Sequence, residues 1–120
     1  MAQVIRTFLI AEAATFVVAA IIHSGRLVIG YEHHEARVAE SIIAAVLLSG
    51  AALTWLRPMW TRAAGLFAQG FALFCTLVGI ATIVAGIGPQ TPLDIVYHIA
   101  IVAVLVWGVA VARRAPVPQT

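Results

Sequence analysis

The residues best suited to chemistry lie in one short polar segment of an otherwise apolar chain. Residues 30–40 read GYEHHEARVAE and hold two histidines, three glutamates and one arginine. In the whole chain only 10% of residues are charged, whereas 62% are hydrophobic. This segment is therefore the first place to look for a functional site.

Imidazole and carboxylate groups from several parts of the chain are predicted to meet near this segment. Neutral imidazole and carboxylate are ordinary ligands of zinc, copper and iron. The sequence therefore predicts a transition-metal site made by His23, His33, Glu40 and His98. Alternatively, two facing histidines would bind a b-type haem at its axial positions. Neither HExxH nor a pair of Glu-x-x-His motifs occurs, so no familiar motif chooses between these cofactors.

Three further ionisable residues are candidates to orient a ligand or to relay protons: Glu12, Arg37 and Asp94. Glu12 precedes His23 by close to three helical turns, so the two are predicted to share a face. Asp94 is four residues before His98 and would share a face with it, which suits an aspartate that orients an imidazole.

Simpler roles remain open for the same residues. Glu12 can pair with Arg6 near the membrane interface, Glu40 can pair with Arg37, and Asp94 can act only as a helix cap. His23 and His98 can also hydrogen-bond to each other or to Glu40 without any metal.

His33 and His34 differ in their expected positions. In a continuous helix His33 shares a face with Glu40, but their separation of seven positions corresponds to about 10 Å along the helix. His33 is thus expected at the rim of the site, and His34 is expected to be solvated.

The elements that must position these residues are predicted to be membrane-spanning helices. The mean hydropathy of +1.04 is far above the range of soluble proteins. Apolar runs of about 20 residues suffice to cross a bilayer. Four such runs fill nearly the whole chain and predict an all-α, four-helix bundle as a single domain, 1–120, with spans at about 4–24, 36–56, 63–85 and 92–112. In the last of these, Thr91, Pro92 and Asp94 mark the helix start.

The arginines predict the orientation of the bundle. Arg6, Arg57, Arg62, Arg113 and Arg114 belong to one side of the membrane, against Arg26 and Arg37 on the other. The positive-inside rule then places both termini in the cytoplasm and the histidines on the extracytoplasmic side, in what we expect to be a bacterial inner membrane. Because the arginines form no patch, nucleic acid is not an expected partner. The single cysteine, Cys75, excludes an internal disulfide.

Three classes of function fit these features. The first is a metal or haem protein that serves as an electron-transfer or oxidoreductase component. The second is a small proton-coupled or ion-coupled transporter that works as a homo-oligomer, with Glu12 and His23 along one helix face. The third is an accessory subunit of a larger membrane complex, held to partner subunits by faces rich in small residues. No nucleophile or general base beside a substrate pocket is evident, so the sequence predicts no catalytic residue.

Overall fold

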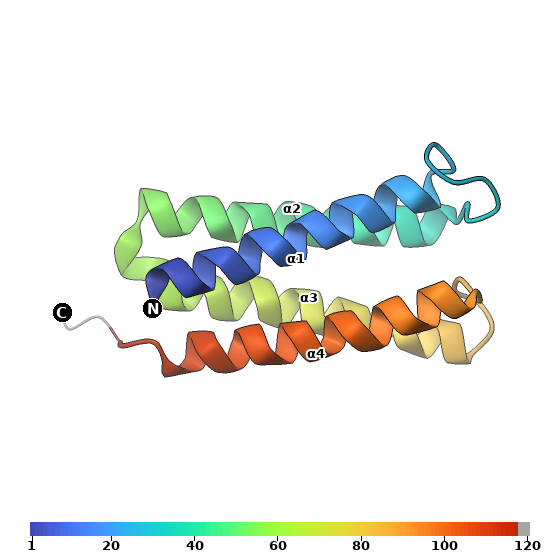
Figure 1. Ribbon diagram of the computed structural model, residues 1–120. Helices are drawn as coiled ribbons and strands as arrows, with labels where there is room; N and C mark the ends of the chain where they lie inside the picture. The colour runs from blue at the N-terminus through green and yellow to red at the C-terminus, as the bar shows by residue number, and fades with distance from the viewer. Residues whose placement is uncertain (118–120) are drawn as a thin grey trace.

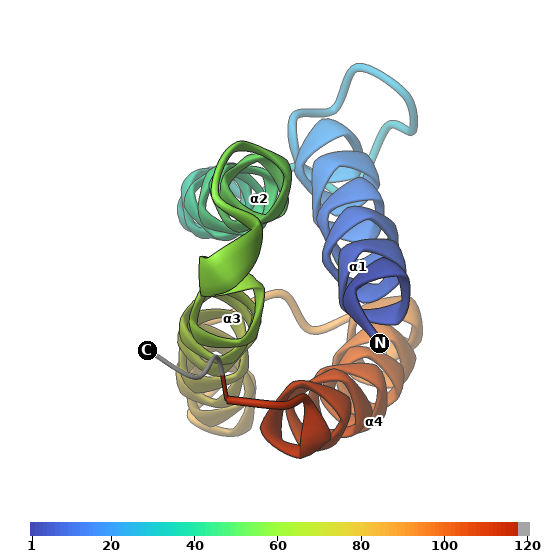
Figure 2. The same ribbon diagram turned by 90° about the vertical axis from the view of Figure 1, so that its left-hand side faces the viewer.

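Residues 1–117 fold into four long helices joined by connections without further long helices (Figure 1). The computed structural model describes residues 1–117, so the last three residues of the predicted domain, 118–120, lie outside the described part. The helices are α1 (Ala2–His23), α2 (His34–Leu56), α3 (Thr61–Val84) and α4 (Pro92–Arg114), with a 3₁₀ turn at Pro58–Trp60 before α3. They run alternately up and down and follow one another around the bundle in chain order (Figure 2).

The lengths and compositions of these helices match the requirements of a bilayer. Each has 22 to 24 residues, which corresponds to about 33 to 36 Å, and a hydrocarbon core is about 30 Å thick. All four are long and apolar enough to cross a membrane. The predicted all-α architecture with four such helices is confirmed.

The inside of the bundle combines many alanines with a few large side chains such as Leu9, Leu47 and Leu105, whereas many other large hydrophobic side chains face outward. Ala13, Ala44, Ala68 and Ala72 are buried in the core, whereas exposed hydrophobic side chains of the outer surface include Ile42, Val18, Phe67, Phe74 and Trp107. Small residues let helix backbones approach closely where no hydrophobic force drives association, as in lipid.

The connections cap the helices. His33 has an extended backbone and accepts the Ala36 N–H at its Nδ1 atom, so α2 begins at His34, two residues before the approximate start of the predicted span. Thr91 and Asp94 form a reciprocal capping box at the start of α4, with Pro92 at the first helical position, as the sequence predicts.

The two ends of the bundle are chemically different. We call the end with the α1–α2 and α3–α4 connections the histidine end, and the end with both termini the terminal end. At the terminal end Arg6 donates to the side chain and the carbonyl of Thr54, and its guanidinium lies 5.2 Å from the ring centre of Trp55. Arg6 thereby satisfies a free carbonyl in the last turn of α2 and does not pair with Glu12.

Candidate functional site

Three ionisable side chains from three helices meet at the histidine end. His23 closes α1, Glu40 lies in the second turn of α2, and Asp94 lies in the first turn of α4; all three are buried. The Nδ1 atom of His23 lies 2.7 Å from Oε2 of Glu40, and its Nε2 atom lies 3.0 Å from Oδ1 of Asp94. We call these three residues the histidine cluster.

Both nitrogens of His23 therefore face carboxylate oxygens. A neutral imidazole has one N–H donor and one lone pair, so it can donate to only one of two carboxylates. Both contacts of the His23 ring are hydrogen bonds when the ring carries two protons, or when one carboxyl group carries its own proton. In either case the cluster holds one proton more than a neutral imidazole between two carboxylates.

Local hydrogen bonds hold Asp94 and the end of α1 in place. The second oxygen of Asp94, Oδ2, accepts from the backbone N–H and the hydroxyl of Thr91. In addition, the backbone N–H of His33 donates to the backbone carbonyl of His23 at 3.0 Å. This bond ties the start of α2 to the end of α1. The helix caps and the cluster are thus one hydrogen-bonded unit.

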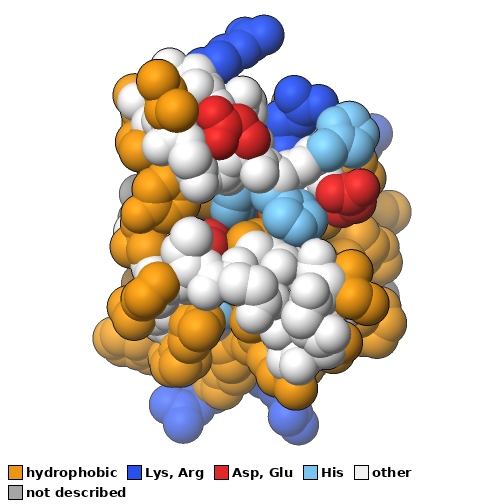
Figure 3. Space-filling view, turned by 90° about the vertical axis from the view of Figure 1, so that its right-hand side faces the viewer, with side chains coloured by type: hydrophobic (Ala, Val, Ile, Leu, Met, Phe, Trp, Pro, Cys, Tyr) orange, Lys and Arg blue, Asp and Glu red, His pale blue; other side chains and the backbone are white. Residues whose placement is uncertain are grey.

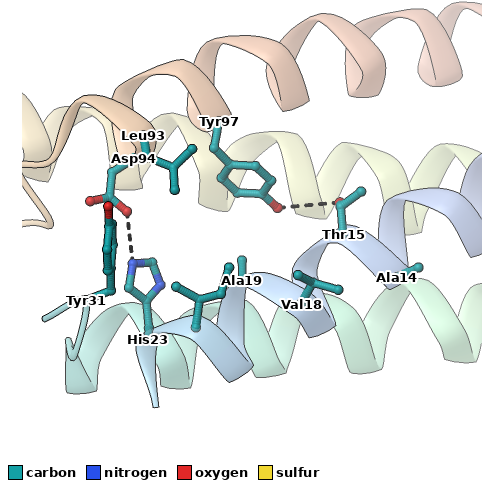
Figure 4. Close-up of a pocket in the computed structure, with 10 residues that line it drawn as sticks. Ala14, Thr15, Val18, Ala19, His23, Tyr31, Leu93, Asp94 and Tyr97 are labelled. Carbon is teal, nitrogen blue, oxygen red and sulfur yellow. Dashed lines mark hydrogen bonds and ion pairs between the residues drawn. The ribbon is translucent and has the colours of Figure 1, made fainter. Parts of the chain in front are cut away.

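The histidine cluster lies between two grooves. A groove of about 400 Å³ runs between α1 and α4 and is lined at one end by His23, Asp94 and Tyr31. Figure 4 shows this groove, with the Tyr97 hydroxyl pointing toward Thr15 further along it; those two oxygens are 3.5 Å apart.

The second groove is larger, with a volume of about 580 Å³. It lies on the side of α2 and α3, and both Glu40 and His98 line it. Each carboxylate of the cluster thus borders a different groove, and the ring of His23 connects them. Seen from the histidine end, histidine and acidic side chains gather between the two interhelical connections, with hydrophobic side chains around them (Figure 3).

The other histidines have separate roles. Because Nδ1 of His33 accepts from Ala36, its Nε2 atom carries the proton and donates to the carbonyl of Ile87 at 3.3 Å. His33 thus caps α2 and ties it to the α3–α4 connection. It lies just before the helix as its N-cap, so the geometry of a continuous helix does not apply to it; it lines the same groove as Glu40, and its ring lies 6.4 Å from that of His23. His34 is exposed and accepts from Arg37.

His98 has one nitrogen in use. Its Nδ1 atom lies 2.7 Å from the carbonyl of Asp94 and must donate to it, since a carbonyl can only accept. The aspartate orients this imidazole through its backbone, whereas its side chain bonds to His23. The neutral ring therefore has its lone pair on Nε2, which lies so close to α3 that a Cβ atom on Gly79 would be 3.3 Å from it.

A second buried polar pair lies in the middle of the bundle. Glu12 and Gln69 are both fully buried, and the Gln69 amide donates to Oε1 of Glu12 at 3.1 Å. Among the residues that the structure describes, no partner reaches the other Glu12 oxygen or the Gln69 carbonyl oxygen. A Cβ atom on Gly108 would collide with both side chains, so this glycine makes the room for the pair.

The structure brings together some of the predicted metal ligands and separates others. Within residues 1–117 no group of three or more His, Cys, Asp or Glu side chains is arranged to hold a metal ion. A metal on His23 would displace a carboxylate, and one on His33 would break the cap of α2. Metal or haem binding by His23, His33, Glu40 and His98 stays a prediction.

Two residues of these sites were not predicted from the sequence. Gln69 is the hydrogen-bond partner of Glu12. Its signal in the sequence is that it is the one strongly polar side chain in its apolar run. Tyr97 carries no such signal, because a tyrosine inside an apolar run does not reveal which groove its hydroxyl enters.

The chain matches no family model, no curated protein and no solved structure with which it was compared. Fold and site therefore define its class by themselves. It is an all-α bundle whose four helices are apolar enough to cross a membrane, with a buried carboxylate–imidazole–carboxylate cluster at one end and a glutamate–glutamine pair at mid-height.

Proposed function

We propose that this chain spans a membrane four times, with both termini in the cytoplasm, and works as a proton-coupled carrier. In this proposal the histidine cluster binds and exchanges a proton on the outer side. Glu12 is the proton site near the middle of the membrane, about 16 Å further along α1. Ionisable side chains inside a bilayer are costly and usually serve ions, protons or substrates.

The observation that carries the proposal is the position of His23 between Glu40 and Asp94. An imidazole can accept a proton on one nitrogen and release a proton from the other. A proton can therefore pass from Glu40 to Asp94 through the ring, and the two carboxylates border separate grooves. The same occupied nitrogens favour proton exchange over metal ligation as the use of this site.

Buried apolar side chains separate the two proton sites. Phe16, Ala13 and Ala19 of α1 lie between Glu12 and His23 and are all buried. An apolar layer between the sites interrupts proton transfer between them in this conformation. This suits a mechanism in which the helices move. A single bundle of 12.7 kDa offers little room for such a movement, and we propose that the carrier is a homo-oligomer.

Proton flux into liposomes tests this function. The purified protein is reconstituted with an internal pH-sensitive dye, and an imposed membrane potential drives proton entry. Wild-type protein is expected to carry protons well above the background of empty liposomes, and Glu12→Gln and His23→Leu are expected to abolish this flux. Wild-type flux equal to that of empty liposomes would overturn the proposal. His34→Ala, at an exposed histidine, is the matched control.

The orientation has its own test. A reporter active only in the cytoplasm, fused after Arg114, is expected to be active, since the positive-inside rule places this end there. Activity of a periplasmic reporter at the same position would invert the bundle and put the histidine cluster on the inner side.

A further inference from the structure

The larger groove, which Glu40 and His98 line, has the features of a small-molecule site. Its volume of about 580 Å³ lies within the range of about 300 to 1,000 Å³ of ligand pockets. Its apolar lining includes Phe16, Ile43, Phe74 and Val78, and its polar groups gather toward the histidine end. A ligand there would have an apolar body and one polar head.

Two residues that line the groove, His98 and Glu40, each have an acceptor atom with no hydrogen-bond partner among the described residues. His98 donates from Nδ1 to its own helix, which leaves the lone pair on Nε2 for the groove. Glu40 bonds to His23 through Oε2, and within the described residues its Oε1 atom accepts no hydrogen bond. Two acceptors select a head group that donates, and they reject a head group that only accepts.

The charged residues around the groove also favour one sign of the ligand's charge. Its ionisable lining residues are His33, Glu35, Glu40 and His98, with the thiol of Cys75. Neither Arg26 nor Arg37 is among them, because both arginines line a different groove, between α1 and α2. The two glutamates therefore face the groove without an arginine beside them, and this favours a cationic ligand.

We propose that this groove binds lipophilic amines in their protonated form. The ammonium N–H groups donate to Oε1 of Glu40 and to Nε2 of His98, and the apolar body lies on Phe16, Phe74 and Val78. This inference rests on the proposed function, for which it names the substrate class. The ammonium group and a proton on the cluster compete for the same carboxylate, Glu40, and this competition provides the exchange.

Four probes with similar phenylalkyl bodies separate the contributions of charge and of hydrogen-bond donation to binding. Phenylbutylamine has an apolar body, a positive charge and N–H donors. Phenylbutanol keeps a donor without the charge, trimethyl(phenylbutyl)ammonium keeps the charge without a donor, and phenylbutyrate reverses the charge. Isothermal titration to the full chain in detergent is expected to show the amine binding at least about tenfold more tightly than each of the others, since a charge-assisted hydrogen bond contributes at least 1.4 kcal/mol or so.

Matched variants locate the site. Ala39 lines the groove, is exposed and is not a member of the cluster, so Ala39→Trp fills the groove and keeps all three cluster side chains; Ala45→Trp, on the same helix, fills a different groove. Ala39→Trp is expected to abolish amine binding, and Ala45→Trp to leave it unchanged. His98→Leu keeps the bulk but removes one acceptor, and it is expected to weaken the amine about tenfold. This second variant tests the site if Ala39→Trp fails to fold.

The outcomes separate this inference from the proposed function. Proton flux in liposomes without amine binding would overturn the inference alone. Amine binding at this groove without proton flux would overturn the carrier and leave the site. Equal binding of the amine and the alcohol would overturn the inference, because the groove would then bind apolar molecules such as lipid chains without regard to charge. Equal loss of amine binding in Ala39→Trp and Ala45→Trp would also overturn it.

Discussion

The histidine cluster and the Glu12–Gln69 pair are both buried, but they differ in how completely their polar atoms are paired. In the cluster, both nitrogens of His23 and both oxygens of Asp94 have partners. In the pair, one hydrogen bond joins the two side chains, and an oxygen of each is left without a partner among the described residues.

This difference separates two uses of buried polarity. A network in which one ring bonds to side chains of two other helices fixes the helices relative to one another, and removing the ring exposes its partners to a large penalty. An unpaired buried oxygen contributes little to stability and leaves a place where a proton or a cation can bind. The cluster therefore combines structural and functional roles, whereas the mid-bundle pair is mainly functional.

The largest effect on stability is expected from His23→Ala. It leaves Glu40 and Asp94 buried without their shared partner, and breaking a buried charged network costs about 3 to 5 kcal/mol. Unfolding in detergent, followed by circular dichroism, measures the loss. If His23→Ala unfolds like His34→Ala, the cluster does not hold the helices together. Adding Glu40→Gln to His23→Ala is expected to recover part of the loss, because it removes one of the unpaired charges.

A smaller effect is expected from Gly108→Ala at the mid-bundle pair. The added methyl group collides with the Gln69 amide and the Glu12 carboxylate, and overpacking of this kind costs about 1 to 3 kcal/mol. Gly70→Ala is the matched control, since a Cβ atom there meets nothing within 4 Å. Equal unfolding of the two variants would mean that the pair can move aside.

Thr91→Ala tests whether the helix cap supports the cluster. It removes the hydroxyl that bonds both the Asp94 N–H and the Asp94 side chain, and loss of such a cap costs about 1 kcal/mol. If the cap also orients Asp94 toward His23, the histidine ring signals in NMR spectra will shift. Unchanged ring signals, with the same loss of stability, would limit Thr91 to capping α4.

Glu12→Gln is expected to separate function from stability most sharply. The amide keeps the shape of the side chain and adds no charge, so the change in unfolding free energy is expected to stay below about 1 kcal/mol. Proton flux in liposomes is nevertheless expected to vanish. A strongly destabilised variant would instead show that the carboxyl group of Glu12 holds the bundle together.

Removal of metal is expected to have the smallest effect. Since His23 and His33 use both ring nitrogens in protein hydrogen bonds, dialysis against EDTA is expected to leave the unfolding curve unchanged. Elemental analysis and an absorption spectrum of the untreated protein complete the test. A near-stoichiometric transition metal, or a Soret band, would favour the cofactor prediction over proton exchange.

Much of the fold follows from the residues in order. Apolar runs bounded by arginine, proline and glycine predict four helices, and Thr-Pro-Leu-Asp predicts where α4 begins, because these signals act within a few residues. The gathering of histidines and acids at one end also follows, since consecutive helices of similar length must alternate in direction.

Partner choice does not follow from the sequence. His23, His33 and His98 were all predicted as ligands of one site, yet only His23 bridges two carboxylates, while His33 caps a helix and His98 bonds to its own backbone. Which side chain points at which neighbour depends on how each helix is rotated about its axis, and that rotation is set by the packing of all four helices.

The sequence alone therefore determined that this chain forms four apolar helices, with its histidines and four of its five acids toward one end and Glu12 within the first helix. Local propensity and hydropathy suffice for this, since each acts along one segment. Only the tertiary structure decided that Gln69 is the partner of Glu12, that His23 joins Glu40 to Asp94, and that these carboxylates border separate grooves. These relations join residues up to 71 positions apart, and they exist only once the helices have packed.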